Sequence, residues 1–116
     1  MPSTSRDPLL YLDELLEAAR LACQFGEGIE RSQYRPGVMA FEAILRQIEI
    51  IGEAASHVPP AIQSQGSEIP WRNLVGMRNH LIHGYFAIDA DIVWSVVHGK
   101  LPAMIPEIKK LIEKLS

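Results

Sequence analysis

The chain has 116 residues and a mass of 13.0 kDa, which is the size of one domain, so an enzyme with separate cofactor and substrate domains is excluded. Its 47% hydrophobic and 22% charged residues are typical of a folded globular protein and exclude a disordered tail or a fibrous repeat. The formal net charge of −3 excludes a protein that coats nucleic acid through a basic field over much of its surface.

The first predicted helix begins at Asp7 and Pro8. Asp7 offers a side-chain acceptor at the N-cap, and Pro8 has the fixed φ angle that suits the first helical position. Gly26 and Gly28 supply the stop. Between these ends, apolar residues recur every three or four positions, as a helix requires: Leu9, Leu12, Leu16, Ala19 and Cys23.

The second predicted helix ends before Pro59 and Pro60, because a proline restricts the residue that precedes it to extended conformations. It follows a polar turn at residues 35–37. Residues 60–66 leave room for one short helical turn. The apolar positions of the second helix again have a helical period: Phe41, Ile44, Leu45, Ile48, Ile51 and Ala55.

The third predicted helix begins with Pro70 at its first position and ends at Gly84, which has the place of a residue that follows a helix C-terminus. Its inward stripe consists of Trp71, Leu74, Met77 and Leu81.

The fourth predicted helix is capped by Asp89. We expect Pro102 and Pro106 to kink or break it, since each removes a backbone donor and crowds the preceding turn. Its apolar stripe is formed by Ile92, Val93, Val96, Val97, Leu101, Ile105, Ile108 and Leu115.

No alternating pattern of useful length predicts a strand, so the fold class is all-α. Four helices with short connections pack most simply as an up-and-down four-helix bundle, here with a kinked last helix, and residues 1–116 form a single domain. A small domain this rich in apolar residues is expected to cover some of them with a second copy or a partner.

Cys23 is the only cysteine, which excludes an intramolecular disulfide and a cysteine-based zinc site. The first residues are polar, and no apolar run approaches the roughly 18 to 20 residues that span a bilayer. We therefore expect a cytoplasmic protein without a membrane partner.

Residues 71–85 read WRNLVGMRNHLIHGY and are more polar than a plain bundle helix requires. Arg78 and His83 are separated by about 7.5 Å of rise and about 140° of rotation on an ideal helix, so they can reach into one cleft from its two sides. His83 lies at the helix end, where the negative end of the helix dipole favours the protonated imidazole.

An arginine and a histidine in one cleft suit the cleavage of RNA. A neutral imidazole can take the proton of a ribose 2′-hydroxyl, and a guanidinium can bind two oxygens of the resulting phosphorane. The products would be a 2′,3′-cyclic phosphate and a free 5′-hydroxyl, and neither a metal nor another cofactor is needed. A twofold dimer would supply a second Arg78 and His83, including the proton donor that the leaving 5′-oxygen requires.

The segment resembles a known family. Arg78-Asn79 and His83-Gly84-Tyr85 fit the Arg-x4-His-x-Tyr motif of HEPN-domain proteins, and the match is closest to the HepT-like toxins of HEPN/MNT toxin-antitoxin pairs. The likeness runs from about residue 11 to about residue 111. It includes Ile50 to Ala55, Pro70-Trp71, Val93-Trp94 and Leu101-Pro102.

This resemblance implies a HEPN fold, a homodimer with a composite cleft and a metal-independent ribonuclease that stops growth. Both tRNA and mRNA are possible substrates. It implies that Arg78 and His83 are catalytic and that Asn79 helps to orient the site. Tyr85 matches the tyrosine that a partner nucleotidyltransferase, the MNT antitoxin, modifies with AMP, which adds bulk and negative charge where RNA phosphate must lie. His80 is expected to be auxiliary.

The sequence leaves other interpretations open. Arg78 and His83 could be a surface arginine and a helix-end histidine, and Tyr85 could be a packing residue. The chain would then be a non-catalytic interaction or substrate-binding subunit of a nucleotidyltransferase. Trp71 and Trp94 could stack on bases but are expected to pack in the core or at a dimer interface. Rim contacts to phosphate could come from Arg72, His98 and Lys100.

A metal site is a further alternative. His80 and His83 form His-x-x-His, and Glu49, Glu53 and His57 lie at i, i+4 and i+8 of the second helix. A di-metal bundle asks for Glu-x-x-His on two helices, and the chain has none. We therefore expect no metal, and a solvated or interface role for Glu49 and Glu53. A further hypothesis is that Glu53 orients Arg78 across the bundle.

Overall fold

The computed structural model describes residues 7–83 and 88–116, and of His83 it describes the backbone alone. The predictions for Gly84, Tyr85 and the His83 side chain therefore lie outside the described residues. The elements are α1 (Pro8–Glu27), η1 (Arg31–Gln33), α2 (Met39–Ser56), α3 (Pro60–Gln63), η2 (Ser64–Gly66), α4 (Trp71–His83), α5 (Ala90–Ser95), η4 (Val96–Lys100) and α6 (Leu101–Leu115).

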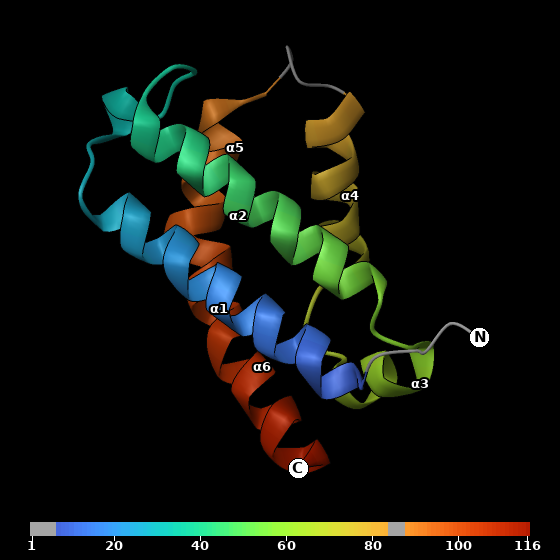
Figure 1. Cartoon of the computed structure of the whole chain (residues 1–116). Helices are drawn as coiled ribbons and strands as arrows, with labels where there is room; N and C mark the ends of the chain where they lie inside the picture. Colours follow the sequence, from blue (N-terminus) through green and yellow to red (C-terminus); the bar gives the residue numbers. More distant parts are fainter. Residues whose placement is uncertain (1–6, 84–87) are drawn as a thin grey trace.

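The described residues form an all-α fold without a strand, as predicted. The long helices alternate in direction, with α1 and α2 side by side, α4 against the C-terminal half of α2, and α5 to α6 returning past α1 (Figure 1). No helix in the described ranges is long and apolar enough to cross a membrane.

Local sequence signals account for the helix ends. The Asp7 carboxylate accepts a hydrogen bond from the Leu9 amide at 3.0 Å, which confirms the predicted cap of α1. The Asp89 carboxylate accepts from the Asp91 amide at 2.9 Å and caps α5 in the same way. Pro70 was predicted to be the first residue of its helix, but α4 begins at Trp71 and Pro70 directly precedes it. The Pro70 carbonyl accepts a hydrogen bond from the Leu74 amide, as the residue before a helix does.

Gly26 does not stop α1, contrary to the prediction. It lies inside the helix and is buried, and α1 ends at the next residue, Glu27, with Gly28 as its C-cap. A Cβ atom on Gly26 would lie 2.5 Å from Val97 Cγ1 and 2.6 Å from the Tyr34 hydroxyl. The absence of a side chain thus lets η4 and Tyr34 pack directly on the backbone of α1.

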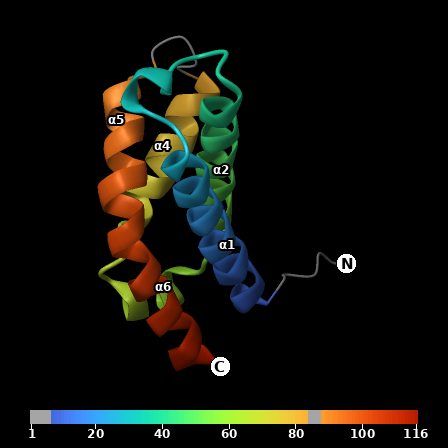
Figure 2. The ribbon, with the colours of Figure 1, turned by 90° about the vertical axis from the view of Figure 1, so that its left-hand side faces the viewer.

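The fourth helix is distorted but continuous. The segments α5, η4 and α6 form one column, which changes direction toward its C-terminal end (Figure 2). The irregularity is the π-helical turn η4, in which the Leu101 amide donates to the Val96 carbonyl five residues back. Pro102 follows directly and brings no amide proton, so the wider turn accommodates the residue that a regular α-helix would exclude. Neither Pro102 nor Pro106 breaks the helix.

The core lies between α1, α2 and the α5–α6 column. Many of its fully buried side chains come from the predicted stripes, and Tyr34 is added from the connection before α2. Leu15 and Leu111 are buried although the stripes did not include them, whereas Ile92, a predicted stripe residue, is 55% exposed. The largest fully buried side chains include Leu12, Leu15, Phe41, Ile44, Ile51, Leu101, Ile108 and Leu111.

Candidate active site

The contact between α2 and α4 is unusually close at Gly52. An added Cβ atom there would collide with the Cβ of Arg78 and would lie 2.8 Å from the Leu74 carbonyl oxygen. Gly52 thus lets α4 pack with its backbone against α2. The same contact sets the root of the Arg78 side chain directly on the surface of α2, beside Glu53.

The Arg78 guanidinium is held by two partners. Its Nη2 lies 2.9 Å from Glu53 Oε1 in an ion pair across the two helices, and its Nη1 donates to Asn79 Oδ1 at 3.2 Å. Its Nε is buried and has no hydrogen-bond partner among the described residues. The side chain as a whole remains 26% exposed. The predicted contact of Glu53 with Arg78 is therefore confirmed, and Asn79 does contact the arginine.

Glu53 has a second partner. Its Oε2 lies 2.9 Å from His57 Nε2, one helical turn further along α2. The His57 ring in turn stacks on the Tyr11 ring of α1, with ring centroids 5.0 Å apart and planes inclined by 19°. A line of contacts therefore runs from α1 through α2 to α4 and ends at the Arg78 guanidinium.

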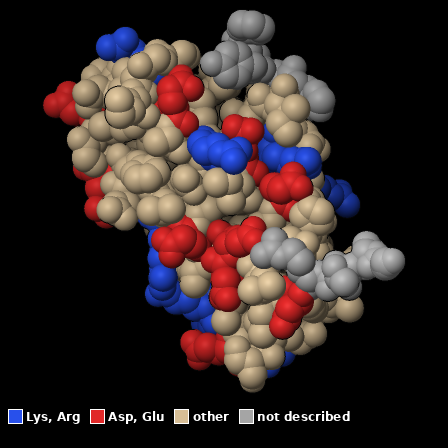
Figure 3. Space-filling view, in the orientation of Figure 1, with Lys and Arg blue, Asp and Glu red and all other residues tan. Residues whose placement is uncertain are grey.

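A cleft of about 230 Å³ opens beside this guanidinium. Its walls carry two arginines and three carboxylates, so the charge in it is mixed. Figure 3 shows this face, with basic and acidic groups interleaved over α2 and α4 and an acidic group over α1. The cleft is lined by Glu14 of α1, by Arg46, Glu49, Ile50 and Glu53 of α2, and by Arg78 and Ile82 of α4.

The other predicted site residues have different places. His80 is exposed and lines a separate groove on another side of α4, so the structure does not bring it beside Arg78, and its auxiliary role stays a prediction. The α4 helix extends to His83, which agrees with the helix-end position that the sequence indicates. The catalytic role of His83 stays a prediction as well.

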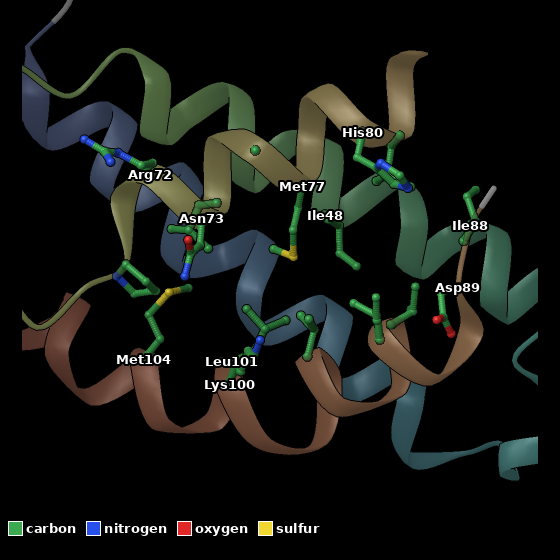
Figure 4. A pocket seen from close by; sticks show the side chains of 17 residues that line it. Ile48, Arg72, Asn73, Met77, His80, Ile88, Asp89, Lys100, Leu101 and Met104 are labelled. Carbon is green, nitrogen blue, oxygen red and sulfur yellow. The ribbon is translucent and has the colours of Figure 1, made fainter. Parts of the chain in front are cut away.

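The groove that His80 lines has a volume of about 650 Å³ and lies between α4 and the α5–α6 column. Met77 and Ile48 point into it opposite Leu101 and Met104 (Figure 4). Its floor is apolar, and its rim is polar. The rim residues are Arg72, Asn73, His80, Asp89 and Lys100.

The hypothetical metal ligands on α2 have other partners. Within the described ranges no three His, Cys, Asp or Glu side chains are grouped so that they could hold a metal ion. Glu53 and His57 instead contact each other, and Glu53 also contacts Arg78. The i, i+4 spacing of Glu53 and His57 is the sequence signal for their contact. No sequence signal indicated that Tyr11 would stack on His57.

The two tryptophans have different environments. Trp71 is buried, and its indole N–H is shared between the carbonyls of Gln63 at 3.2 Å and Gly66 at 3.1 Å, which confirms a core position. Trp94 is 38% exposed and stacks on His98 with ring centroids 4.5 Å apart. Neither tryptophan lines the cleft beside Arg78.

Comparison with known proteins supports a ribonuclease function. The chain matches the family described as Ribonuclease HepT-like over residues 15–111. It is 34% identical to the "Probable ribonuclease HepT" of Thermococcus cleftensis, over 87% of this chain and 92% of that protein. It is also 34% identical to the "Putative RNase MJ1380" of Methanocaldococcus jannaschii, over 95% and 97% of the two chains. A relative from Caldanaerobacter subterraneus, "Putative RNase TTE0752", is 28% identical over 94% and 97%. No solved structure matches the chain.

Proposed function

This chain belongs to the HepT-like ribonuclease family, and we propose that it is a metal-independent endoribonuclease that cleaves RNA with Arg78 and His83. The observation that carries the proposal is the placement of Arg78, which is fixed at its root by Gly52 and at its tip by Glu53 and borders an open cleft. A guanidinium in a defined orientation suits the binding of a phosphate, because its planar fork matches two phosphate oxygens.

In the proposed reaction, the His83 imidazole takes the proton from the ribose 2′-hydroxyl, and the 2′-oxygen attacks the adjacent phosphorus. Arg78 stabilises the charge that develops on the phosphorane oxygens. The P–O bond to the 5′-oxygen breaks, and that oxygen takes a proton from the protonated His83 imidazole of the second copy in the dimer, which becomes neutral. The products are a 2′,3′-cyclic phosphate and a 5′-hydroxyl. Because the protein is net acidic, we infer that it prefers exposed single-stranded or loop segments of tRNA or mRNA.

A homodimer is part of this proposal, and Gly76 supports it. A glycine inside a helix costs about 0.5–1 kcal/mol relative to alanine. Gly26 and Gly52 each occupy a close contact within the chain, whereas a Cβ on Gly76 would meet nothing within 4 Å. Gly76 is exposed on α4 and lines, with Arg72 and His80, the groove of about 650 Å³. A second copy that packs its α4 helix at Gly76 would explain the glycine and bring two motif helices together.

The test compares the wild type with Arg78→Ala and His83→Ala. Each purified protein is incubated with RNA in the presence and absence of EDTA, and the 3′ ends of the products are analysed. We expect cleavage by the wild type alone, unaffected by EDTA, with 2′,3′-cyclic phosphate ends. Loss of the wild-type activity in EDTA, or equal cleavage by all three proteins, would contradict the mechanism.

We further propose that the protein is the toxin of a HEPN/MNT pair and that an MNT-type nucleotidyltransferase neutralises it by transferring AMP to Tyr85. The support is the family membership and the Arg-x4-His-x-Tyr pattern. After incubation with the partner and ATP, the intact mass should rise in steps of AMP. Tyr85→Phe should abolish this rise, and an undiminished rise in that variant would exclude Tyr85 as the acceptor.

The second candidate function is a non-catalytic interaction subunit of a nucleotidyltransferase. The apolar groove of about 650 Å³ favours it, since large exposed apolar surfaces commonly bind partners. The same cleavage experiment separates the two functions. Absent cleavage by the wild type and by His83→Ala alike, in preparations free of the partner, would favour the interaction subunit.

A further inference from the structure

We propose that Glu53 is a positioning residue for Arg78 and that His57 holds Glu53 in place. This inference rests on the proposed ribonuclease function and deepens it. Glu53 and His57 both lie outside the Arg-x4-His-x-Tyr pattern. Glu53 contacts Arg78 directly, and His57 contacts Glu53.

The Arg78 side chain is restrained at both of its ends. Arginine loses about 2 kcal/mol of rotamer entropy when it is held in one conformation, so a guanidinium must be restrained before it can act as a fixed phosphate receptor. Gly52 restrains only the root of the side chain, at Cβ. The ion pair of Nη2 with Glu53 restrains the other end, at a distance of 2.9 Å.

The Arg78 guanidinium keeps N–H donors that Glu53 and Asn79 do not use. Each terminal nitrogen of a guanidinium carries two N–H groups. One on Nη2 goes to Glu53, and one on Nη1 goes to Asn79. One N–H on each terminal nitrogen therefore remains. A bidentate phosphate contact uses two such N–H groups. Glu53 and Asn79 thus hold the guanidinium and still leave two N–H donors for a phosphate.

Both carboxylate oxygens of Glu53 have a partner. A glutamate that is exposed on a helix surface has freely rotating side-chain torsions, and Glu53 is 53% exposed. Its Oε2 accepts from His57 Nε2 at 2.9 Å, and the His57 ring is in turn stacked on Tyr11. One oxygen is therefore tied to its own helix and the other points to α4. A carboxylate held at both oxygens can fix the position of its arginine.

A competing view treats Glu53 as an inhibitor, because a carboxylate lowers the positive charge that attracts phosphate. The two views predict opposite signs for the removal of Glu53. Positioning predicts a slower reaction, whereas competition predicts tighter substrate binding and a faster one.

The experiment measures kcat and KM on a short RNA for Glu53→Gln and Glu53→Ala. Glu49→Gln and Glu49→Ala are the matched controls, since Glu49 lies one turn earlier on α2, lines the same cleft and forms no ion pair with Arg78. We expect kcat to fall by about tenfold to hundredfold in Glu53→Ala, with KM changed by less than about threefold. Glu53→Gln should be intermediate, because its amide oxygen can still accept from Nη2. The Glu49 variants remove a carboxylate from the same cleft without removing a partner of Arg78, so kcat should fall much less in them than in Glu53→Ala.

His57 is tested in the same assay with His57→Gln and His57→Ala. Gln keeps a side-chain N–H that can donate to Glu53, so His57→Gln should retain most of the activity, whereas His57→Ala should lower kcat by about threefold to tenfold. Thermal unfolding followed by circular dichroism identifies any variant that has lost its fold. If Glu53→Ala is folded and equals Glu49→Ala, or is faster than the wild type, the positioning role is refuted. If the wild type itself does not cleave RNA, the proposed function fails instead.

Discussion

Gly52 and Arg78 meet where α2 and α4 cross, and no methyl group fits between them. The contact links stability to the proposed chemistry, because the residue that permits the two helices to touch also determines where the Arg78 side chain begins. A change at Gly52 should therefore affect both the free energy of unfolding and the activity.

The first prediction concerns this contact. Gly52→Ala should lower the free energy of unfolding by about 1–3 kcal/mol, since the added methyl group overpacks against Leu74 and Arg78. RNA cleavage should fall as well, because α4 must shift. Urea unfolding and the cleavage assay measure the two effects. Unchanged stability in Gly52→Ala would show that the two helices do not touch as closely as described.

The second prediction uses Gly76, the glycine inside α4 that has open space around it. Gly76→Ala should stabilise the isolated chain by about 0.5–1 kcal/mol, because alanine is the better helix former and meets no neighbour. Gly76→Leu should preserve the fold but weaken self-association, as measured by analytical ultracentrifugation. A Gly76→Leu variant that dimerises as tightly as the wild type would place the interface elsewhere.

The third prediction separates the charge of Arg78 from its shape. Arg78→Lys keeps the positive charge but loses the planar fork, and kcat should fall by about a hundredfold to a thousandfold. Arg72→Lys is the matched control, since Arg72 is an exposed arginine of the same helix that lines the other groove. Equal activity of the two variants would mean that Arg78 contributes charge alone.

The fourth prediction concerns alkaline pH. Burial, and secondarily the nearby Glu27 carboxylate, raises the pKa of the Cys23 thiol above its ordinary value of 9.0. The folded protein therefore keeps this proton when the unfolded chain has lost it, and the resulting stability is present below about pH 9 and disappears as the pH rises through the folded-state pKa. Cys23→Ala should show a shallower loss of unfolding free energy between about pH 8 and about pH 11.

Tyr34 should also make the free energy of unfolding fall with rising pH, in a higher pH range than Cys23. Burial, and secondarily the Cys23 charge, raises the pKa of Tyr34 above its ordinary value of 10.0, and Arg31 only partly offsets this rise. Some alkaline slope should therefore persist in Cys23→Ala. Identical slopes of the wild type and Cys23→Ala would show that the thiol ionises equally in the folded and unfolded chains.

Much of the fold could be predicted because its signals are local. Asp7 and Asp89 cap helices through hydrogen bonds to residues two positions away, and the apolar period marks the buried side of each helix. The motif around Arg78 could be found for the same reason, since its residues lie within one short segment. Pro102 was also recognised as a cause of irregularity, but the form of that irregularity, a π turn before the proline, depends on how the column packs.

The amino-acid sequence by itself determined the number of long helices, their approximate ends, much of the buried side of each and the segment that carries the polar motif, because these depend on neighbours along the chain. Only the tertiary structure decided that Gly26 and Gly52 are contact points between helices, that the two oxygens of Glu53 contact Arg78 and His57, and that His80 lines a different groove. These outcomes depend on the distance and rotation between helices, which arise from the packing of many side chains at once.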